Sequence, residues 1–300
     1  MVELVGFALA AASSVSLGIS KILTRKGLLT MDLTSGVFLT LLPALPILLG
    51  FTLALGEFSK SLVLTPWSVL LVFLGGFFNH NLGRQLIYGS IKTIGASRTG
   101  QVSSLQIPLA SFLGLALLGE ELSLLLLLGT SLVFFGILAI AFSGPSMGPQ
   151  IRGGRFTFLK GLSLGLGGGV VWALAWVSSR AAVISLGSAL FAALLGYVTA
   201  FLVQGALVSV KGGLRVAPRA GRKELLFLLG SGVATAIGYT LYYMSLALLP
   251  VVLAAPISSL SPVVATVGSY LLIQTIERVN LGVVLATVLV FAGSYLVVSS

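Results

Sequence analysis

Residues 225–248 read LLFLLGSGVATAIGYTLYYMSLAL, an uncharged stretch long enough to cross a lipid bilayer as one helix. Nine other stretches of the chain are similarly long and predominantly apolar. The ten predicted spans are 4–20, 33–54, 66–88, 96–118, 123–143, 157–179, 186–209, 225–248, 251–273 and 280–298. Their length favours helices over barrel strands, which need only about 10 alternating residues. We therefore expect an all-α integral membrane protein with ten transmembrane helices.

The composition supports that class and excludes several others. Of the 300 residues, 57% are apolar and 8% are charged, against about 25% charged in a soluble domain. Cysteine is absent and His80 is the single histidine, which excludes disulfides, zinc–thiolate sites, iron–sulfur clusters and multi-histidine metal sites. We expect no metal and no cofactor. The net charge of +10 resides in short gaps between apolar stretches, which is typical of membrane topology and not of nucleic-acid binding.

The chain resembles itself when it is shifted by 155 positions. The equivalent residues include Gly6 and Gly161, Arg25 and Arg180, Gly50 and Gly205, Tyr88 and Tyr243, and Ser103-Ser104-Leu105 and Ser258-Ser259-Leu260. Each half then holds five helices, and because five is odd the second half enters the membrane from the opposite side. We predict two five-helix inverted-topology repeats, 1–143 and 157–300, joined by a loop at 144–156. Secondary transporters often use this architecture, with a substrate site near the midplane.

Several short motifs resemble the ten-helix, EamA-like branch of the drug/metabolite transporter superfamily. They are Trp172-Ala173-Leu174 and Ser179-Arg180, then Ser245-Leu246, Pro250 and Ser259-Leu260-Ser261-Pro262, and in the first half Leu118-Gly119-Glu120 with Leu122-Ser123. The resemblance implies a carrier of small metabolites, often amino acids or related compounds, that frequently exports them. Leu17-Gly18 stands where the family often has Trp-Gly, and the polar residues of the third span are also unusual. These departures concern the substrate more than the fold.

The third span carries an unusual polar face. Asn81, Arg84, Gln85 and Tyr88 follow i, i+3, i+4, i+7 spacing, which places them on one side of a helix, and His80 lies on an adjoining face. The equivalent stretch of the eighth span contains Thr235, Tyr239, Thr240 and Tyr243. We predict that these two helices line a central cavity. In the alternative, Arg84 extends to the lipid headgroups and His80 is a packing residue.

Two further groups of residues are candidates for the cavity wall. In the fourth and ninth spans, polar residues precede prolines, which kink helices and free carbonyl groups. From these spans we predict substrate contacts at Gln101, Ser104 and Ser259 and hinges at Pro108, Pro256 and Pro262. The alternative is that the serines satisfy the freed backbone groups. In the sixth span, Trp172 and Trp176 form either an aromatic wall of the cavity or a lipid-facing anchor.

Two small groups in the sequence are assigned structural roles. Lys21 is equivalent to Trp176 in the other repeat and follows the first apolar stretch, so we predict it to be a topology charge and not a ligand. Gly161, Gly165 and Gly169 repeat at every fourth residue. Their shared face predicts a close helix contact.

The acidic residues are absent from the predicted membrane interior. All seven lie in connections or at helix ends: Glu3, Asp32, Glu57, Glu120, Glu121, Glu224 and Glu277. A carrier of cations normally needs an intramembrane carboxylate, whereas the guanidinium of Arg84 suits carboxylate or phosphate. We predict an anionic or zwitterionic substrate bound near Arg84. Facilitated diffusion or exchange is then favoured over proton coupling.

The basic residues predict the orientation. Most of the seventeen lie after the odd-numbered spans: Lys21, Arg25, Lys26, Lys92, Arg152, Arg155, Lys211, Arg215, Arg219, Arg222, Lys223 and Arg278. The positive-inside rule places that side in the cytoplasm and both termini outside a cell membrane. The family resemblance implies cytoplasmic termini, so the two arguments disagree, and the charge argument is preferred.

Together these features predict a non-enzymatic secondary transporter that works by alternating access around a midplane cavity, as an exporter or exchanger. The alternative is a flippase for lipid-linked substrates, or a membrane partner subunit that does not transport. The expected partners are a small-molecule substrate and the lipid bilayer. Because the duplication supplies both halves, we expect a monomer, with a dimer as the alternative.

Overall fold

The computed structural model describes residues 2–59, 64–119, 123–142, 155–211, 221–258, 260–272 and 281–298. These residues form helices and short turns, and the described part of the chain holds no strand. The predicted all-α membrane class is thereby confirmed. Six helical stretches are long and apolar enough to cross a membrane: Glu3–Gly27, Leu33–Ala54, Ala96–Leu117, Arg155–Leu186, Ala189–Lys211 and Arg222–Leu248.

Helical segments occupy all ten predicted spans. Six spans contain one helix each: α1 (Val2–Gly27), α8 (Leu124–Phe142), α9 (Arg155–Leu186), α10 (Ala189–Lys211), α11 (Arg222–Leu248) and α14 (Leu281–Val298). The other four are divided into α2 (Leu33–Leu41) and α3 (Ala44–Ala54), α4 (Pro66–Gly76) with the π-helix η2 (Phe77–Leu82) and α5 (Gly83–Ile94), α6 (Ala96–Ser103) and α7 (Gln106–Leu118), and α12 (Val251–Ser258) and α13 (Ser261–Leu272). A short 3₁₀ turn, η1 (Glu57–Ser59), follows α3.

The divisions of the fourth and ninth spans are equivalent in the two repeats. α6 ends at Ser103 and α7 begins at Gln106, while α12 ends at Ser258 and α13 begins at Ser261. The third and eighth spans differ, because η2 interrupts the third whereas α11 runs unbroken. Within the described residues, the first repeat therefore carries a π-turn and the second does not, and such turns are often found at functional sites.

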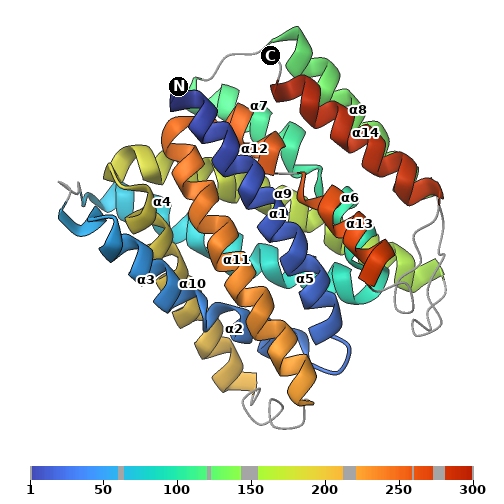
Figure 1. Ribbon diagram of the computed structural model, residues 1–300, viewed down its shortest axis with the longest axis horizontal. Helices are drawn as coiled ribbons and strands as arrows, with labels where there is room; N and C mark the ends of the chain where they lie inside the picture. The colour runs from blue at the N-terminus through green and yellow to red at the C-terminus, as the bar shows by residue number, and fades with distance from the viewer. Residues whose placement is uncertain are drawn as a thin grey trace.

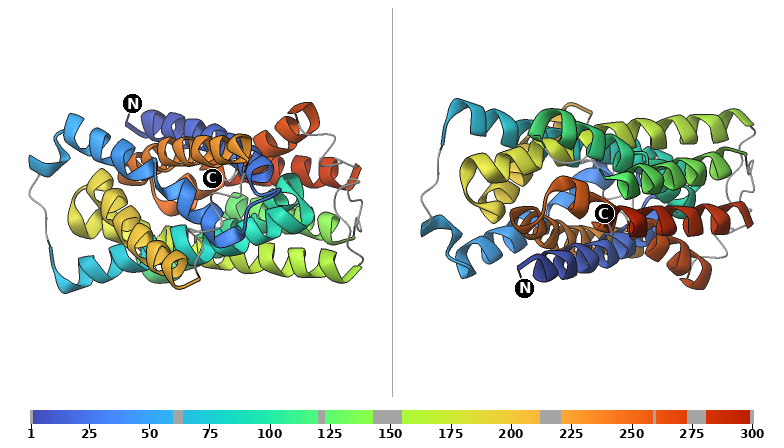
Figure 2. Two further views of the ribbon diagram at one scale, coloured as in Figure 1. Left: turned by 90° about the horizontal axis from the view of Figure 1, so that it is seen from below. Right: turned by 90° about the horizontal axis from the view of Figure 1, so that it is seen from above.

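The helices lie in two layers, with α1 and α11 in one layer and α9 in the other (Figure 2). α1 and α11 run side by side across the face shown in Figure 1. Small hydroxyl side chains join them: Ser20 Oγ lies 2.9 Å from Ser231 Oγ and 2.6 Å from Thr235 Oγ1. α8 and α14 pack together at one edge of the molecule (Figure 1).

Glycines allow the closest helix contacts. A Cβ atom on Gly161 would lie 2.4 Å from Ile94 Cγ2, and one on Gly169 would lie 2.9 Å from the Ser103 carbonyl oxygen. The predicted close-packing face of the sixth span is thus confirmed. At the crossing of α4 and α10 the close contact is with backbone, because a Cβ on Gly76 would lie 2.4 Å from the Gly196 carbonyl oxygen.

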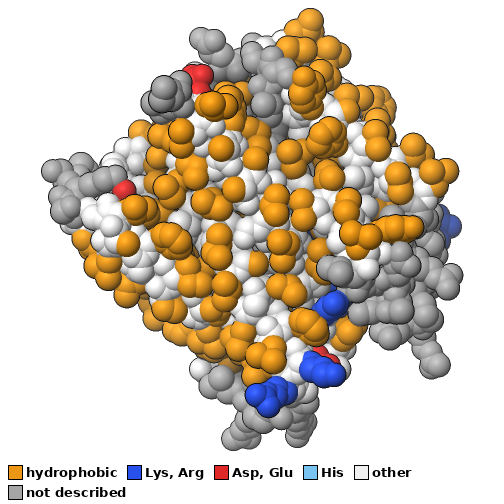
Figure 3. Space-filling model, viewed as in Figure 1, with side chains coloured by type: hydrophobic (Ala, Val, Ile, Leu, Met, Phe, Trp, Pro, Cys, Tyr) orange, Lys and Arg blue, Asp and Glu red, His pale blue; other side chains and the backbone are white. Residues whose placement is uncertain are grey.

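The outer surface is suited to lipid. Apolar side chains cover most of the face in Figure 3, and Lys and Arg side chains gather at its lower end. Large exposed apolar residues include Phe112, Leu202, Leu285 and Phe291. A bilayer gives such a surface an apolar surrounding that water does not.

Candidate functional site

A narrow cavity lies among six helices near the middle of the fold. Its volume is about 40 Å³, enough for about three waters. The lining residues are Leu17, Ser20, Lys21 and Thr24 of α1, Arg84, Ile87, Tyr88 and Ile91 of α5, Gln106 of α7, Trp172 and Trp176 of α9, Thr235 and Tyr239 of α11, and Ser261 of α13. Both repeats thus contribute to one site, and the third and eighth spans both line it.

Arg84 lies inside the protein at this cavity. Its side chain is only 3% exposed, which contradicts the alternative that it extends to the headgroups. Nη1 donates to Thr40 Oγ1 at 3.1 Å, and Nη2 contacts His80 Nδ1 at 3.1 Å and donates to Tyr197 Oη at 3.3 Å. A guanidinium group has five N–H donors. Three of them have partners among the described residues, so two remain for a ligand.

His80 lies in η2 and contacts the Arg84 side chain. Because a guanidinium can only donate, His80 Nδ1 must accept the hydrogen bond, which makes the ring neutral with its proton on Nε2. The ring lies 3.9 Å from the Tyr197 ring centroid and 4.8 Å from that of Tyr239. Protonation of Nδ1 would break this contact and place two cations together, so the geometry favours a packing and positioning role over proton transfer.

Lys21 is a lining residue that the sequence assigned to topology. It is 7% exposed, its Nζ donates to Ser261 Oγ at 2.9 Å, and it lies 5.9 Å from the Trp172 ring. The earlier prediction is wrong because the apolar stretch ends before the helix does. α1 continues to Gly27, which places Lys21 more than a turn inside the helix.

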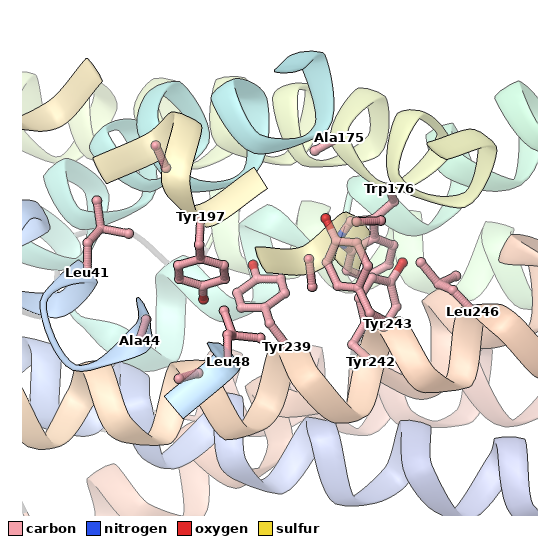
Figure 4. Close-up of a cluster of buried hydrophobic side chains, with 14 of the residues drawn as sticks. Leu41, Ala44, Leu48, Ala175, Trp176, Tyr197, Tyr239, Tyr242, Tyr243 and Leu246 are labelled. Carbon is pink, nitrogen blue, oxygen red and sulfur yellow. The ribbon is translucent and has the colours of Figure 1, made fainter. Parts of the chain in front are cut away.

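Four aromatic side chains from α9 and α11 pack in one cluster (Figure 4), and two of them, Trp176 and Tyr239, line the cavity. Trp176 lies 5.1 Å from Tyr242, and Tyr242 lies 6.3 Å from Tyr239 and 6.2 Å from Tyr243 between ring centroids. Tyr243 is fixed by a 2.9 Å contact between its hydroxyl and Ser179 Oγ. We call Trp176, Tyr239, Tyr242 and Tyr243 the aromatic layer.

A second cavity of about 420 Å³ lies beyond the aromatic layer. Val5 and Leu9 near the start of α1 line it, together with Leu248 at the end of α11. Glu57 and Arg180 are its charged lining residues: Glu57 accepts from Ser188, and Arg180 donates to the Leu246 carbonyl. This vestibule lies at the end of the molecule opposite the last turn of α1.

The central cavity follows the internal repeat. Four pairs of lining residues are 155 positions apart: Leu17 and Trp172, Lys21 and Trp176, Arg84 and Tyr239, and Gln106 and Ser261. In two of these pairs the first repeat supplies a cation and the second supplies an aromatic ring. The cavity is therefore symmetric in position but asymmetric in charge.

Six predicted contacts lie outside this lining, for different reasons, and one of them is His80, which contacts Arg84 from η2. Asn81 Nδ2 donates to the Ala200 carbonyl at 3.0 Å, because η2 changes the helical phase before Arg84 and turns Asn81 toward α10. Gln101 Nε2 donates to Thr266 and Thr287. Ser104 Oγ donates to the Gly100 carbonyl, as the backbone alternative predicted. Tyr243 belongs to the aromatic layer, and Gln85 is half-buried away from the lining.

The remaining predictions concern the breaks in the fourth and ninth spans. Ser259 lies outside the described residues. Pro256 lies within α12, and Pro108 and Pro262 lie in the first turns of α7 and α13, where proline is tolerated. Sequence reasoning missed Ser20, Thr24 and Gln106, although Gln106 is equivalent to Ser261. The hinge roles of the three prolines and the contact role of Ser259 remain predictions.

Comparison with known proteins is consistent with this architecture. The EamA-like transporter family matches residues 4–142 and 159–299, two stretches whose starts are 155 positions apart. The chain belongs to the EamA-like transporter family. It is therefore a membrane transporter of the drug/metabolite transporter superfamily, as its motifs suggested. No curated protein matches the chain. The chain is also similar to a crystal structure whose title reads only "Crystal structure of protein", with a TM-score of 0.67 and 16% sequence identity. The match covers 99% of this EamA-like chain and 96% of the other chain, which shows a shared fold.

Proposed function

We propose that this EamA-like protein is a secondary carrier of small anionic or zwitterionic metabolites, amino acids among them. The observation that carries the proposal is the pair of buried cations, Lys21 and Arg84, lining one cavity. Among the described residues, no carboxylate lines that cavity. Buried charges are costly unless they are paired, so a ligand that brings a carboxylate or phosphate compensates them.

Alternating access accounts for the two cavities. The aromatic layer separates the central cavity from the vestibule that contains Arg180, so a substrate at Arg84 is shielded from that end. In an inverted repeat, the equivalent movement of the other half closes the opposite end. We propose that the paired breaks between α6 and α7 and between α12 and α13 allow this movement, with Pro108, Pro256 and Pro262 near the breaks.

The test is counterflow in liposomes with labelled amino acids and organic phosphates. Arg84→Gln is expected to lower counterflow about 10- to 100-fold, since hydrogen bonds to a charged group are worth about 1.5–3 kcal/mol. Lys160→Gln is the matched control, because Lys160 is exposed at the start of α9. Equal transport by Arg84→Gln and the unaltered protein would contradict the proposal.

A folded protein without counterflow for either class would favour the flippase or the partner subunit. Transfer of lipid-linked phosphates between leaflets of the same liposomes would then separate those two. Melting temperatures of both variants in detergent verify that lost transport does not reflect lost folding.

A further inference from the structure

The charge asymmetry of the central cavity narrows the substrate class, and this argument rests on the proposed carrier function. The first repeat places Lys21 and Arg84 at the cavity, where the second places Trp176 and Tyr239. Both cations come from helices of the same repeat, α1 and α5. The rings of Trp172, Trp176 and Tyr239, from α9 and α11 of the second repeat, line the same cavity. A ligand therefore meets both positive charge and aromatic surface there.

A negatively charged ligand favours the charged form of both side chains. Arginine stays protonated in proteins. Lys21 donates to the Ser261 hydroxyl and lies 5.9 Å from the Trp172 ring, and a ligand carboxylate or phosphate beside it favours its ammonium form. Lys21 has three donors, and the Ser261 hydroxyl accepts one of them among the described residues, so two are left for a ligand.

Charge balance separates three kinds of ligand. A zwitterion brings no net charge, so it leaves both positive charges uncompensated and places its own ammonium group near them. A monoanion leaves one. A dianion compensates both positive charges. Each uncompensated charge is costly in a low-dielectric interior, so the difference in binding free energy between these ligands is large. His80 adds no charge, since its Nδ1 accepts from Arg84.

We infer that the substrate is an organic dianion, a dicarboxylate or a phosphate monoester, whose negative groups contact Lys21 and Arg84. Its apolar part lies against Trp172, Trp176 and Tyr239. Within the range of the proposed function, amino acids with one carboxylate and one ammonium group are then transported more slowly than dianions.

The experiment compares compounds of one length in reconstituted liposomes. Succinate, butyrate and 4-aminobutyrate share a four-carbon chain and differ in charge as dianion, monoanion and zwitterion. Glycerol 3-phosphate and glycerate form a second set for the phosphate arm. Counterflow is measured for the unaltered protein, for Lys21→Met, which keeps the length of the side chain, and for Lys160→Met as the exposed control.

We expect a dianion to be transported about tenfold or more faster than its matched monoanion and zwitterion, the change that one hydrogen-bonded charge supplies. Lys21→Met should remove most of that preference, while Lys160→Met retains it. Arg84-dependent transport of 4-aminobutyrate or butyrate at the rate of succinate would overturn the inference and leave the carrier function standing. An unchanged preference in Lys21→Met would also overturn it. Absence of counterflow for every compound would overturn both.

Discussion

Arg25 and Arg180 are equivalent residues of the two repeats, and they donate to equivalent carbonyls at opposite ends of the molecule. Arg25 Nη1 donates to the Ile91 carbonyl at 2.7 Å, and Arg180 Nη1 donates to the Leu246 carbonyl. Each arginine therefore ties the first helix of its repeat to the last turns of the third. Cations at helix C-termini are favoured by the helix dipole, so both contacts stabilise the closed packing at their own ends.

The first prediction concerns these two contacts. Arg180→Gln should loosen the vestibule end and raise the thiol reactivity of a cysteine introduced at Leu190, which lines the vestibule. Arg25→Gln should leave that reactivity nearly unchanged, because Arg25 acts at the other end. The rate of maleimide labelling measures both, and the natural absence of cysteine gives a clean background. Equal labelling in the two variants would show that the arginines do not act separately.

The aromatic layer gives a second prediction. Trp176→Ala removes a large ring between the central cavity and the vestibule and leaves space in its place. We expect a passive leak of small solutes that the unaltered protein lacks, together with a loss of stability of about 3–5 kcal/mol. Efflux from preloaded liposomes measures the leak. Exposed Trp67→Ala is the matched control, and tight liposomes with Trp176→Ala would argue against the layer as a barrier.

Asn81 provides a third prediction, since it contacts α10 and not the cavity. Asn81→Ala leaves the Gln204 side chain and the Ala200 carbonyl without this partner, at a cost of about 1–3 kcal/mol. We expect a lower melting temperature with the Michaelis constant for transport unchanged. Thermal unfolding in detergent and saturation kinetics in liposomes separate the two effects. A raised Michaelis constant at unchanged stability would place Asn81 in the binding site.

A fourth prediction tests the crossing of α4 and α10. Gly76→Ala puts a methyl group 2.4 Å from the Gly196 carbonyl oxygen, so the backbones must separate. Overpacking of this kind costs about 1–3 kcal/mol, and the melting temperature should fall. Gly50→Ala is the control, because a Cβ there meets nothing within 4 Å. Equal melting temperatures for both variants would show that the crossing relaxes freely.

The orientation gives the fifth prediction. If the basic end faces the cytoplasm, a cysteine at Glu3 reacts with an impermeant thiol reagent in intact cells, and a cysteine at Lys160 reacts only after permeabilisation. Both positions are exposed in the structure. The reverse pattern would support the orientation that the family resemblance implies.

Much of the fold was predictable because apolar length and a repeat are properties that a sequence displays directly. Helical spacing predicted Arg84 and Tyr88 at the cavity, and the internal repeat predicted Tyr239 there. The prediction that Asn81 faces the cavity was wrong because η2 changes the helical phase. No pattern in the local sequence predicts a π-turn there. Lys21 was misassigned because the end of an apolar stretch was taken for the end of a helix. Its equivalence to Trp176 was the available signal, since lining positions recur at the repeat interval.

The two cations of the central cavity have a consequence for transport across an energised membrane. In the proposed carrier, α1 and α5 rearrange between two states, so the empty protein would move the charge of Arg84, and that of Lys21 when it is protonated, through part of the electric field. A full crossing of one charge corresponds to about 2.3 kcal/mol per 100 mV, and a ligand of opposite charge cancels this in proportion. Voltage would then act mainly on the return of the empty protein, favouring the state in which Lys21 and Arg84 lie nearer the negative side.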